Sequence, residues 1–233
     1  MSTSHAHAFQ PTRWTLVARA TQDDAPAARA ALDELCQIYW PPLFSFATRW
    51  GLSAADAEDA TQNYFAELLR NDKFAIADAD RGKLRTFLLH SFTKRLINLR
   101  DRDHHRDNIS FDQLETPLDP ADPQNPELSF NRQWAIATME NAMRHLADEY
   151  VQSGKEAFFT ACRPLLGIDA AGNEDYALIA KQIGIKEGAL RVATHRLRHR
   201  FREIIFAIIA ETLDNPTEAS VRAEIGVLME SLA

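Results

Sequence analysis

The sequence predicts an all-α protein with two helical domains joined by a proline-rich linker. Hydrophobic residues make up 45% and charged residues 25% of the 233 residues, which is typical of a globular protein. Gly is scarce, at 8 residues, and Val and Ile are dispersed rather than gathered into the alternating runs that indicate strands. Prolines recur every three residues between 117 and 126, which predicts an extended linker between two helical regions.

The first domain is expected to span residues 9–106. Residues 1–12 read as a loose arm, and helical order begins in the segment 13–20. Apolar residues at helical spacing predict helices over 25–50, 53–69 and 84–102. Pro41 and Pro42 should kink or divide the first of these helices. Ser53-x-x-Asp56 is a variant of an N-capping signal and marks the start of the second.

The second domain is expected to span 127–213, after a linker over 107–126 and before a C-terminal extension over 214–233. Its predicted helices cover about 127–152 and 155–166, then a helix-turn-helix that continues to about 213, and finally about 217–232. The residues after 203 are too apolar for a free tail. We expect them to form a helical hairpin that folds back on the second domain; the alternative is a regulatory or partner-binding segment.

Charge is distributed unevenly along the chain. The formal net charge is −7, yet residues 176–202 hold seven Lys and Arg against one acidic residue. Residues 81–106 hold eight Lys and Arg against two acidic residues. An acidic body with two separate basic blocks predicts a polyanionic partner that is contacted at two places.

The basic block at 176–202 has the pattern of a helix-turn-helix. A short apolar stripe ends at Gly184, and a longer amphipathic helix follows. Leu190, Ala193, Leu197 and Phe201 form the stripe expected to pack on the domain, and Glu187, Arg191, His195, Arg198 and Arg202 lie opposite. The first half of such a helix reaches base edges, which favours Arg191 and His195. Arg196, Arg198 and Arg200 are placed for phosphates; the simpler alternative is a solvated basic face.

An acidic helix begins near residue 54. Asp56, Asp59 and Gln62 recur at i, i+3 and i+6 and share one face, which Glu58 and Glu67 extend. Ala57, Ala60, Tyr64 and Leu68 are expected on the buried side. From charge alone, a solvated helix start is the simpler interpretation, and no neighbouring residue indicates catalytic carboxylates.

Two segments resemble bacterial RNA polymerase sigma factors of the extracytoplasmic-function class. They are DAEDATQNYF at 56–65 and IAKQIGIKEGALRVATHRLRHRFRE at 179–203. The order of acidic helix, basic aromatic helix, linker and helix-turn-helix is also similar to that class, over about residues 9–213. Pro11–Val17 and Tyr39–Leu43 resemble a subgroup with long linkers and a C-terminal extension.

The resemblance implies a region-two domain that binds the clamp helices of the largest subunit of core RNA polymerase and opens the minus-ten promoter element. It implies a region-four domain that reads the minus-thirty-five element in the major groove. The implied polymerase contacts are Asp56, Glu58, Asp59 and Gln62. The implied minus-ten contacts are Lys83, Arg85, Lys94, Arg95, Asn98 and Arg102, with the loop over 78–85 holding a flipped base. The implied minus-thirty-five contacts are Lys186, Arg191, His195, Arg198 and Arg202.

Two positions, Lys186 and Thr194, depart from the pattern of this class. Lys186 stands where the class has a capping Ser and lacks a capping oxygen, which predicts a weaker start of the recognition helix. Thr194 occupies a normally aliphatic position and predicts looser packing. Phe87 and Phe92 are aromatic residues in the strand-melting region, but their spacing favours core packing.

The predicted protein is a non-enzymatic, cytoplasmic transcription initiation subunit that needs no cofactor or metal. The longest apolar run, Ile204–Ala210, is too short to span a membrane, and the N-terminus lacks a secretion signal. Cys36 and Cys162 are expected as reduced thiols. The resemblance also implies an anti-sigma factor or a regulatory kinase as a partner, and Thr61 is a candidate for phosphorylation.

Two rival functions remain at this point. The first is a helix-turn-helix regulator that binds promoters without joining core polymerase. The second is a helical enzyme with a metal at His104 and His105, but adjacent histidines point to different sides of a helix and no Cys or third His lies near them in sequence.

Overall fold

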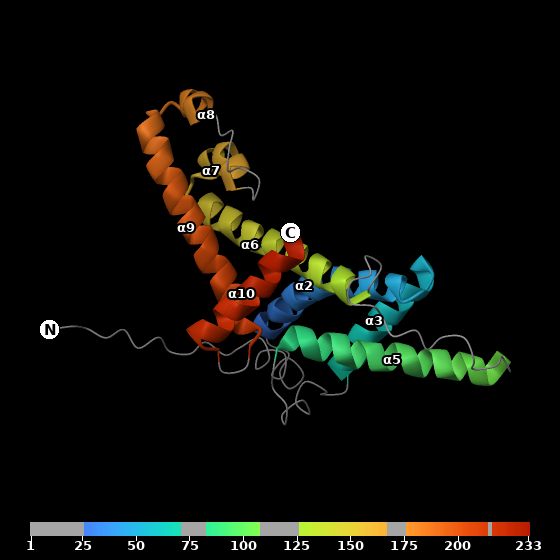
Figure 1. Ribbon diagram of the computed structural model, residues 1–233. Coiled ribbons are helices and arrows are strands. Elements are labelled where there is room, and N and C mark those ends of the chain that lie inside the picture. The colour runs from blue at the N-terminus through green and yellow to red at the C-terminus, as the bar shows by residue number, and fades with distance from the viewer. Residues whose placement is uncertain (1–25, 71–82, 108–125, 167–175, 214–215) are drawn as a thin grey trace. The chain divides into compact units, whose positions relative to one another are not determined.

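The computed structural model describes residues 26–70, 83–107, 126–166, 176–213 and 216–233 (Figure 1). Side chains are described from 33 to 68 and from 83 to 100, and throughout the later ranges. The elements are α2 (Pro26–Arg49), α3 (Ala54–Arg70), α5 (Leu84–Asp107), α6 (Pro126–Gln152), α7 (Glu156–Cys162), the 3-10 helix η2 (Arg163–Leu166), α8 (Tyr176–Gln182), α9 (Glu187–Glu211) and α10 (Glu218–Leu232). These ranges contain no strand, which confirms the all-α prediction.

The predicted arm at 1–12, the segment 13–20, the loop at 71–82 and the centre of the linker lie outside the described residues. So do the side chains of Arg102, His104 and His105.

Residue contacts divide the chain into two compact units. One unit contains the chain up to Ala137 together with Ile209–Ala233, and the other is Thr138–Ile208. The expected domain boundaries, after residues 126 and 213, differ from this division. The first part of α6 and all of α10 belong to the first unit.

The first unit is built around α2, α3 and α5, which contact one another. Their fully buried residues include Leu35, Ile38, Leu43, Phe46, Ala57, Leu84, Leu88 and Phe92. The Tyr64 ring lies 5.0 Å from the Phe92 ring, and the Tyr64 hydroxyl donates to the backbone oxygen of Leu88 at 3.1 Å. Burial of Phe92 confirms its predicted core role, whereas Phe87 is only partly buried.

Helix α2 contains Pro41 and Pro42 within its span, so of the two expected effects, a kink or a division, the division into two helices does not occur. Each proline removes one backbone donor, which costs the helix stability. Tyr39, Leu43 and Phe46 on both sides of the prolines are buried. Burial of large apolar side chains contributes about 1.5–3 kcal/mol each and offsets that loss.

The second unit packs the later part of α6 with α7, η2, α8 and most of α9. Its buried residues include Leu146, Phe159, Cys162, Leu165, Leu166, Ala180, Leu190, Leu197 and Phe201. The Tyr150 ring stacks on Phe158 with centroids 6.0 Å apart and lies 5.6 Å from Phe159. This core supports the helix-turn-helix formed by α8 and α9.

Helix α10 does not meet the expectation that the chain after 203 folds back on the second domain. Its buried carboxylate, Glu224, pairs with Lys83 and Arg85 at the start of α5. Long-range ion pairs of this kind leave no periodic signal in the sequence, so the hydrophobic pattern alone could not choose this packing partner.

No described helix is both long enough and apolar enough to cross a membrane. Cys36 and Cys162 are free thiols, as predicted.

Candidate nucleic-acid and polymerase interfaces

Gly184 forms the turn of the helix-turn-helix. It has a φ of 71°, in the left-handed region that favours glycine. Its N–H donates to the Lys181 oxygen at 3.3 Å, and the N–H of Ile185 donates to the Ala180 oxygen at 3.0 Å. This pair of bonds is a Schellman motif, which ends α8 and directs the chain into α9.

Helix α9 begins immediately after Lys186. The Lys186 backbone oxygen accepts from the N–H of Leu190 at 3.0 Å, and its side chain is exposed. Glu187 lies in the first turn. A carboxylate there interacts favourably with the positive end of the helix dipole. The start of the recognition helix therefore has electrostatic support despite the departure at Lys186.

The two predicted faces of α9 are present. Leu190 and Leu197 are fully buried, and Phe201 is nearly so. Arg191, His195, Arg196 and Arg202 are exposed. The surface residues are therefore free to meet a ligand while the apolar stripe packs within the unit.

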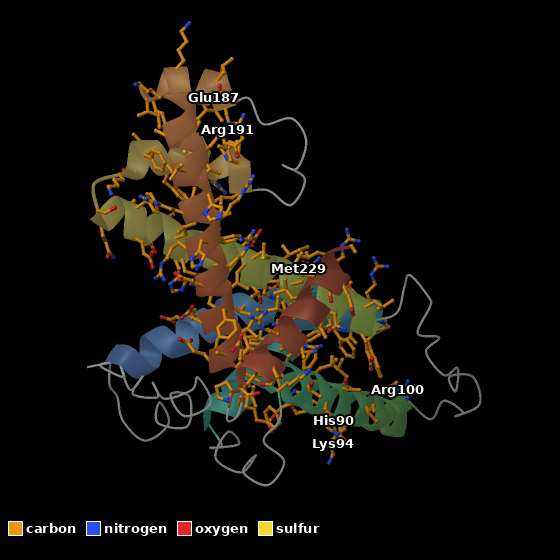
Figure 2. All side chains as sticks on the ribbon, turned by 60° about the vertical axis from the view of Figure 1, so that its left-hand side comes forward. His90, Lys94, Arg100, Glu187, Arg191 and Met229 are labelled. Carbon is orange, nitrogen blue, oxygen red and sulfur yellow. The ribbon has the colours of Figure 1, made fainter. Side chains whose placement is uncertain are left out.

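Arg191 is held in place at this surface. Its Nε and Nη2 donate to Glu187 Oε1 at 3.0 and 2.8 Å (Figure 2). Its guanidinium also lies 4.4 Å from the centre of the Tyr176 ring, at the start of α8. These two contacts orient the guanidinium near the first turns of α9, where base edges are read.

Arg198 differs from the other predicted DNA contacts. Its Nε and Nη2 both donate to the backbone oxygen of Leu165 in η2, at 3.0 and 2.8 Å. This engagement makes it a bridge between α9 and η2 in the structure. The sequence placed Arg198 on the exposed face because helical periodicity cannot reveal a backbone acceptor 33 residues away.

Arg200 is also engaged within the unit. It forms hydrogen bonds to both carboxylate oxygens of Glu149, at 2.9 and 2.6 Å, and to Glu203 at 2.9 Å. The hydrogen bond from Arg200 lowers the pKa of Glu149, and the two carboxylates raise the pKa of Arg200. Arg196 is thus the more accessible of these two cations for a phosphate.

Val192 was not selected from the sequence, yet 54% of it is exposed. It follows Arg191 in the chain and lies beside His195 on the exposed side of α9. Apolar side chains at such positions contact the methyl group of thymine. An apolar residue within an otherwise charged helical face was the signal that could have identified it.

The acidic face of α3 is exposed. Asp56, Glu58, Asp59 and Gln62 all lie on it, while Ala57, Ala60, Tyr64 and Leu68 are buried as predicted. Ser53 caps the helix: its Oγ accepts from the Asp56 N–H at 3.2 Å and donates to the Asp56 carboxylate at 2.6 Å. Asp56 therefore has a structural role as well as a surface position.

Thr61 does not lie on this exposed face. It is fully buried, and its hydroxyl donates to the Ala57 oxygen at 2.7 Å. A kinase cannot reach the hydroxyl in this state, which argues against Thr61 as a phosphorylation site.

The predicted minus-ten residues do not form one exposed set. Lys94 and Asn98 are exposed on α5, whereas Lys83 and Arg85 are engaged by Glu224. Arg95 pairs with Glu67 of α3. Arg102 and most of the loop at 78–85 lie outside the described side chains.

His90 was also missed. It is exposed, one helical turn before Lys94, and Figure 2 shows the two side chains together on α5. Its four-residue spacing from Lys94 was the available signal.

Comparisons with known proteins agree with the motifs. No family model matches the chain, and no solved structure matches it. The chain is 26% identical over 223 residues to the ECF RNA polymerase sigma factor SigE of Mycolicibacterium smegmatis, covering 91% of this chain and 79% of that protein. A helical fold with a helix-turn-helix and an exposed acidic helix has the organisation of a sigma factor. This similarity supports the resemblance to sigma factors of the extracytoplasmic-function class.

Proposed function

We propose that this protein is an alternative sigma factor, which joins core RNA polymerase and directs it to specific promoters. The observation that carries the proposal is the presence in one chain of an exposed acidic face on α3 and an exposed basic face on the recognition helix α9. One face suits a basic protein surface and the other suits DNA. Such a subunit acts by positioning the polymerase in the cytoplasm and has no catalytic residues of its own.

The polymerase contact is assigned to α3. Asp56, Glu58, Asp59 and Gln62 would meet the clamp helices of the largest subunit. The support is that all four side chains are exposed on a helix whose other side is anchored by buried residues. Charge complementarity of this kind accelerates association and selects the partner.

The minus-thirty-five contact is assigned to α9. Arg191 and His195, with Val192 beside His195, would reach base edges, and Lys186, Arg196 and Arg202 would hold phosphates. Arg198 would position the helix through Leu165. The minus-ten contact would use Lys94 and Asn98, with His90 beside them, on the exposed side of α5.

These assignments keep the region-two function in the first unit and the region-four function in the second. An anti-sigma factor that blocks the protein would have to cover the acidic face of α3 or the exposed face of α9.

The test is run-off transcription with core polymerase, the protein and a pool of promoter fragments. We expect transcripts from a specific subset of the pool. The Asp59→Lys variant should lose both transcription and co-purification with core polymerase. Asp59 is preferred to Asp56 because Asp56 also contacts the capping Ser53.

The matched control is Asp148→Lys, which reverses an exposed acidic residue on α6. It should retain transcription. Promoter binding without any association with core polymerase would contradict the proposal and support the helix-turn-helix regulator instead.

A further inference from the structure

Glu224 is a charged residue in the interior of the first unit. Its side chain is 1% exposed, although it lies on the C-terminal helix α10. Glu224 Oε1 accepts from Arg85 Nε at 2.9 Å, and Glu224 Oε2 lies 2.6 Å from Lys83 Nζ. Burying a carboxylate costs several kcal/mol unless cations compensate for the charge, so the pair Lys83 and Arg85 is what permits this burial.

The two contacts of Glu224 are unequal. Oε1 receives a directed hydrogen bond from Arg85. Oε2 has close charge contact with Lys83 but no hydrogen bond of acceptable geometry among the described residues. Arg85 therefore holds the carboxylate by a hydrogen bond and Lys83 holds it by charge, and a phosphate oxygen is an acceptor of the same kind for both cations.

Arg85 also contacts the first part of α6. Its Nη1 donates to Asn131 Oδ1 at 2.6 Å, and its guanidinium lies 4.8 Å from the centre of the Trp134 ring. Arg85 thus contacts a carboxylate, an amide and an indole, and Lys83 contacts the same carboxylate. Trp134 is buried, so the indole supports the guanidinium. Neighbouring cations that follow the phosphate backbone are part of the chemistry that binds single-stranded nucleic acid.

Thr212 and Leu213, which come before α10 in the chain, contact the start of α5. The Leu84 N–H donates to the Thr212 oxygen at 3.0 Å, and Lys83 and Leu213 form an isolated β-bridge. Helix α10 then begins with a capping box between Thr217 and Ser220. Helix α10 thus has a capped N-terminus, and its Glu224 contacts the start of α5.

The two sides of α10 have different chemistry. Val221, Glu224 and Leu228 are buried, whereas Arg222, Met229 and Glu230 are exposed. Met229 is labelled in Figure 2. Helix α10 is short, and one of its three buried side chains is a carboxylate, so it adds little to the hydrophobic core of the first unit. The charge contact at Glu224 is thus a substantial part of what distinguishes this docked position.

We propose that the Lys83–Arg85 pair is a binding subsite for a phosphodiester of single-stranded DNA, and that Glu224 occupies this subsite as an internal competitor. Opening of α10 releases the two cations to the DNA strand. The inference rests on the proposed function, because the resemblance assigns Lys83 and Arg85 to strand capture. It assigns to α10 the role of a lid on that subsite.

Competition of this kind has a measurable consequence. The apparent dissociation constant for single-stranded DNA is the intrinsic constant divided by the fraction of molecules in which Glu224 is undocked. Removing the negative charge without changing the size of the side chain should raise the affinity.

The experiment uses the full chain and a fluorescein-labelled single-stranded oligonucleotide of mixed sequence, without polymerase. Fluorescence anisotropy gives the dissociation constant at several salt concentrations. Glu224→Gln should bind about tenfold more tightly than the wild-type protein. Each phosphate contact on a single strand contributes about 0.7 to the slope of log K against log salt, so Glu224→Gln/Arg85→Gln should show a slope about 0.7 shallower than Glu224→Gln.

Glu230→Gln is the matched control, because it makes the same change on the exposed side of α10. It should leave the affinity and the slope unchanged. The double variant Glu224→Gln/Arg85→Gln should lose most of the gain. Unchanged or weaker binding by Glu224→Gln would overturn the proposal, as would an absence of binding by both proteins.

A second measurement avoids any loss of stability in the variants. Hydrogen exchange of the wild-type protein should show reduced protection of the α10 amides when single-stranded DNA is added. Equal or greater protection of the α10 amides would contradict the proposal that α10 opens when single-stranded DNA binds. Transcription with core polymerase is a separate readout, so failure of the lid and failure of the sigma-factor function can be distinguished.

Discussion

The guanidinium of Arg198 donates two hydrogen bonds to the backbone oxygen of Leu165. Leu165 is 2% exposed, so this carbonyl has little access to water. A buried acceptor that loses its partner carries the full cost of desolvation. The position of the recognition helix relative to η2 within the second unit therefore depends on a side chain that the sequence alone assigned to DNA.

Replacing Arg198 should destabilise the second unit. Arg198→Met keeps most of the side-chain length and removes the donors, and we expect a loss of about 1–3 kcal/mol in the free energy of unfolding. Urea unfolding followed by circular dichroism measures this change. Arg196→Met is the control at an exposed position and should change the stability by less than about 0.5 kcal/mol. If Arg198→Met lost DNA binding without losing stability, Arg198 would be a direct contact to DNA.

Thr194 should tolerate, and benefit from, loss of its hydroxyl. It is fully buried, and its Oγ1 has no hydrogen-bond partner among the described residues. Thr194→Val keeps the shape and removes the unpaired polar atom, so we expect a gain of about 1 kcal/mol in thermal or urea unfolding. The same change at the exposed Thr160 should have little effect. A loss of stability at Thr194 would indicate an ordered water on the hydroxyl.

Tyr176 should influence DNA binding through Arg191. Its ring supports the guanidinium at 4.4 Å, and a contact of this kind is worth about 0.5–1 kcal/mol. Tyr176→Leu should raise the dissociation constant for the cognate duplex by about threefold to fivefold and affect a random duplex less. Tyr176→Phe keeps the ring and should bind more like the wild-type protein. Equal losses on both duplexes would indicate general loosening of α8.

The pair Glu149–Arg200 should make a small pH-dependent contribution to stability. The hydrogen bond from Arg200 lowers the pKa of Glu149 in the folded protein, so the contribution is present at neutral pH and is lost as the pH falls through the folded-state pKa. Both side chains are substantially exposed, which limits the effect to about 0.5 kcal/mol. Glu149→Gln should therefore be slightly less stable at pH 7, with the difference vanishing in acid. A difference that grows in acid would contradict this assignment.

Cys36 should react slowly with alkylating agents. Burial, with a smaller effect of Asp33, raises the pKa of its thiol from 9.0 to about 11. The thiolate is the reactive form, so at pH 8 the folded protein should alkylate about 100-fold more slowly at Cys36 than the urea-unfolded chain. Mass spectrometry after timed iodoacetamide treatment measures the rate at this residue. Equal rates in the two states would show that the thiol is accessible and unperturbed.

Local sequence features predicted much of the fold. The helical spacing of apolar residues gave the positions of α3, α5, α6 and α9, because the helix period depends only on neighbouring residues. Ser53 and Gly184 marked a helix start and a turn for the same reason: their capping bonds are local. The exposed acidic and basic faces followed from the same periodicity.

The sequence by itself thus determined an all-helical chain with an acidic helix and a basic helix-turn-helix. Tertiary structure alone decided which cations remain available: Arg198 bonds a carbonyl 33 residues away, and Arg85 bonds a carboxylate 139 residues away. It also decided that α10 packs in the first unit. The physical reason is that such partners are selected by burial and charge compensation in space, and sequence periodicity carries no record of distances that the folded chain creates.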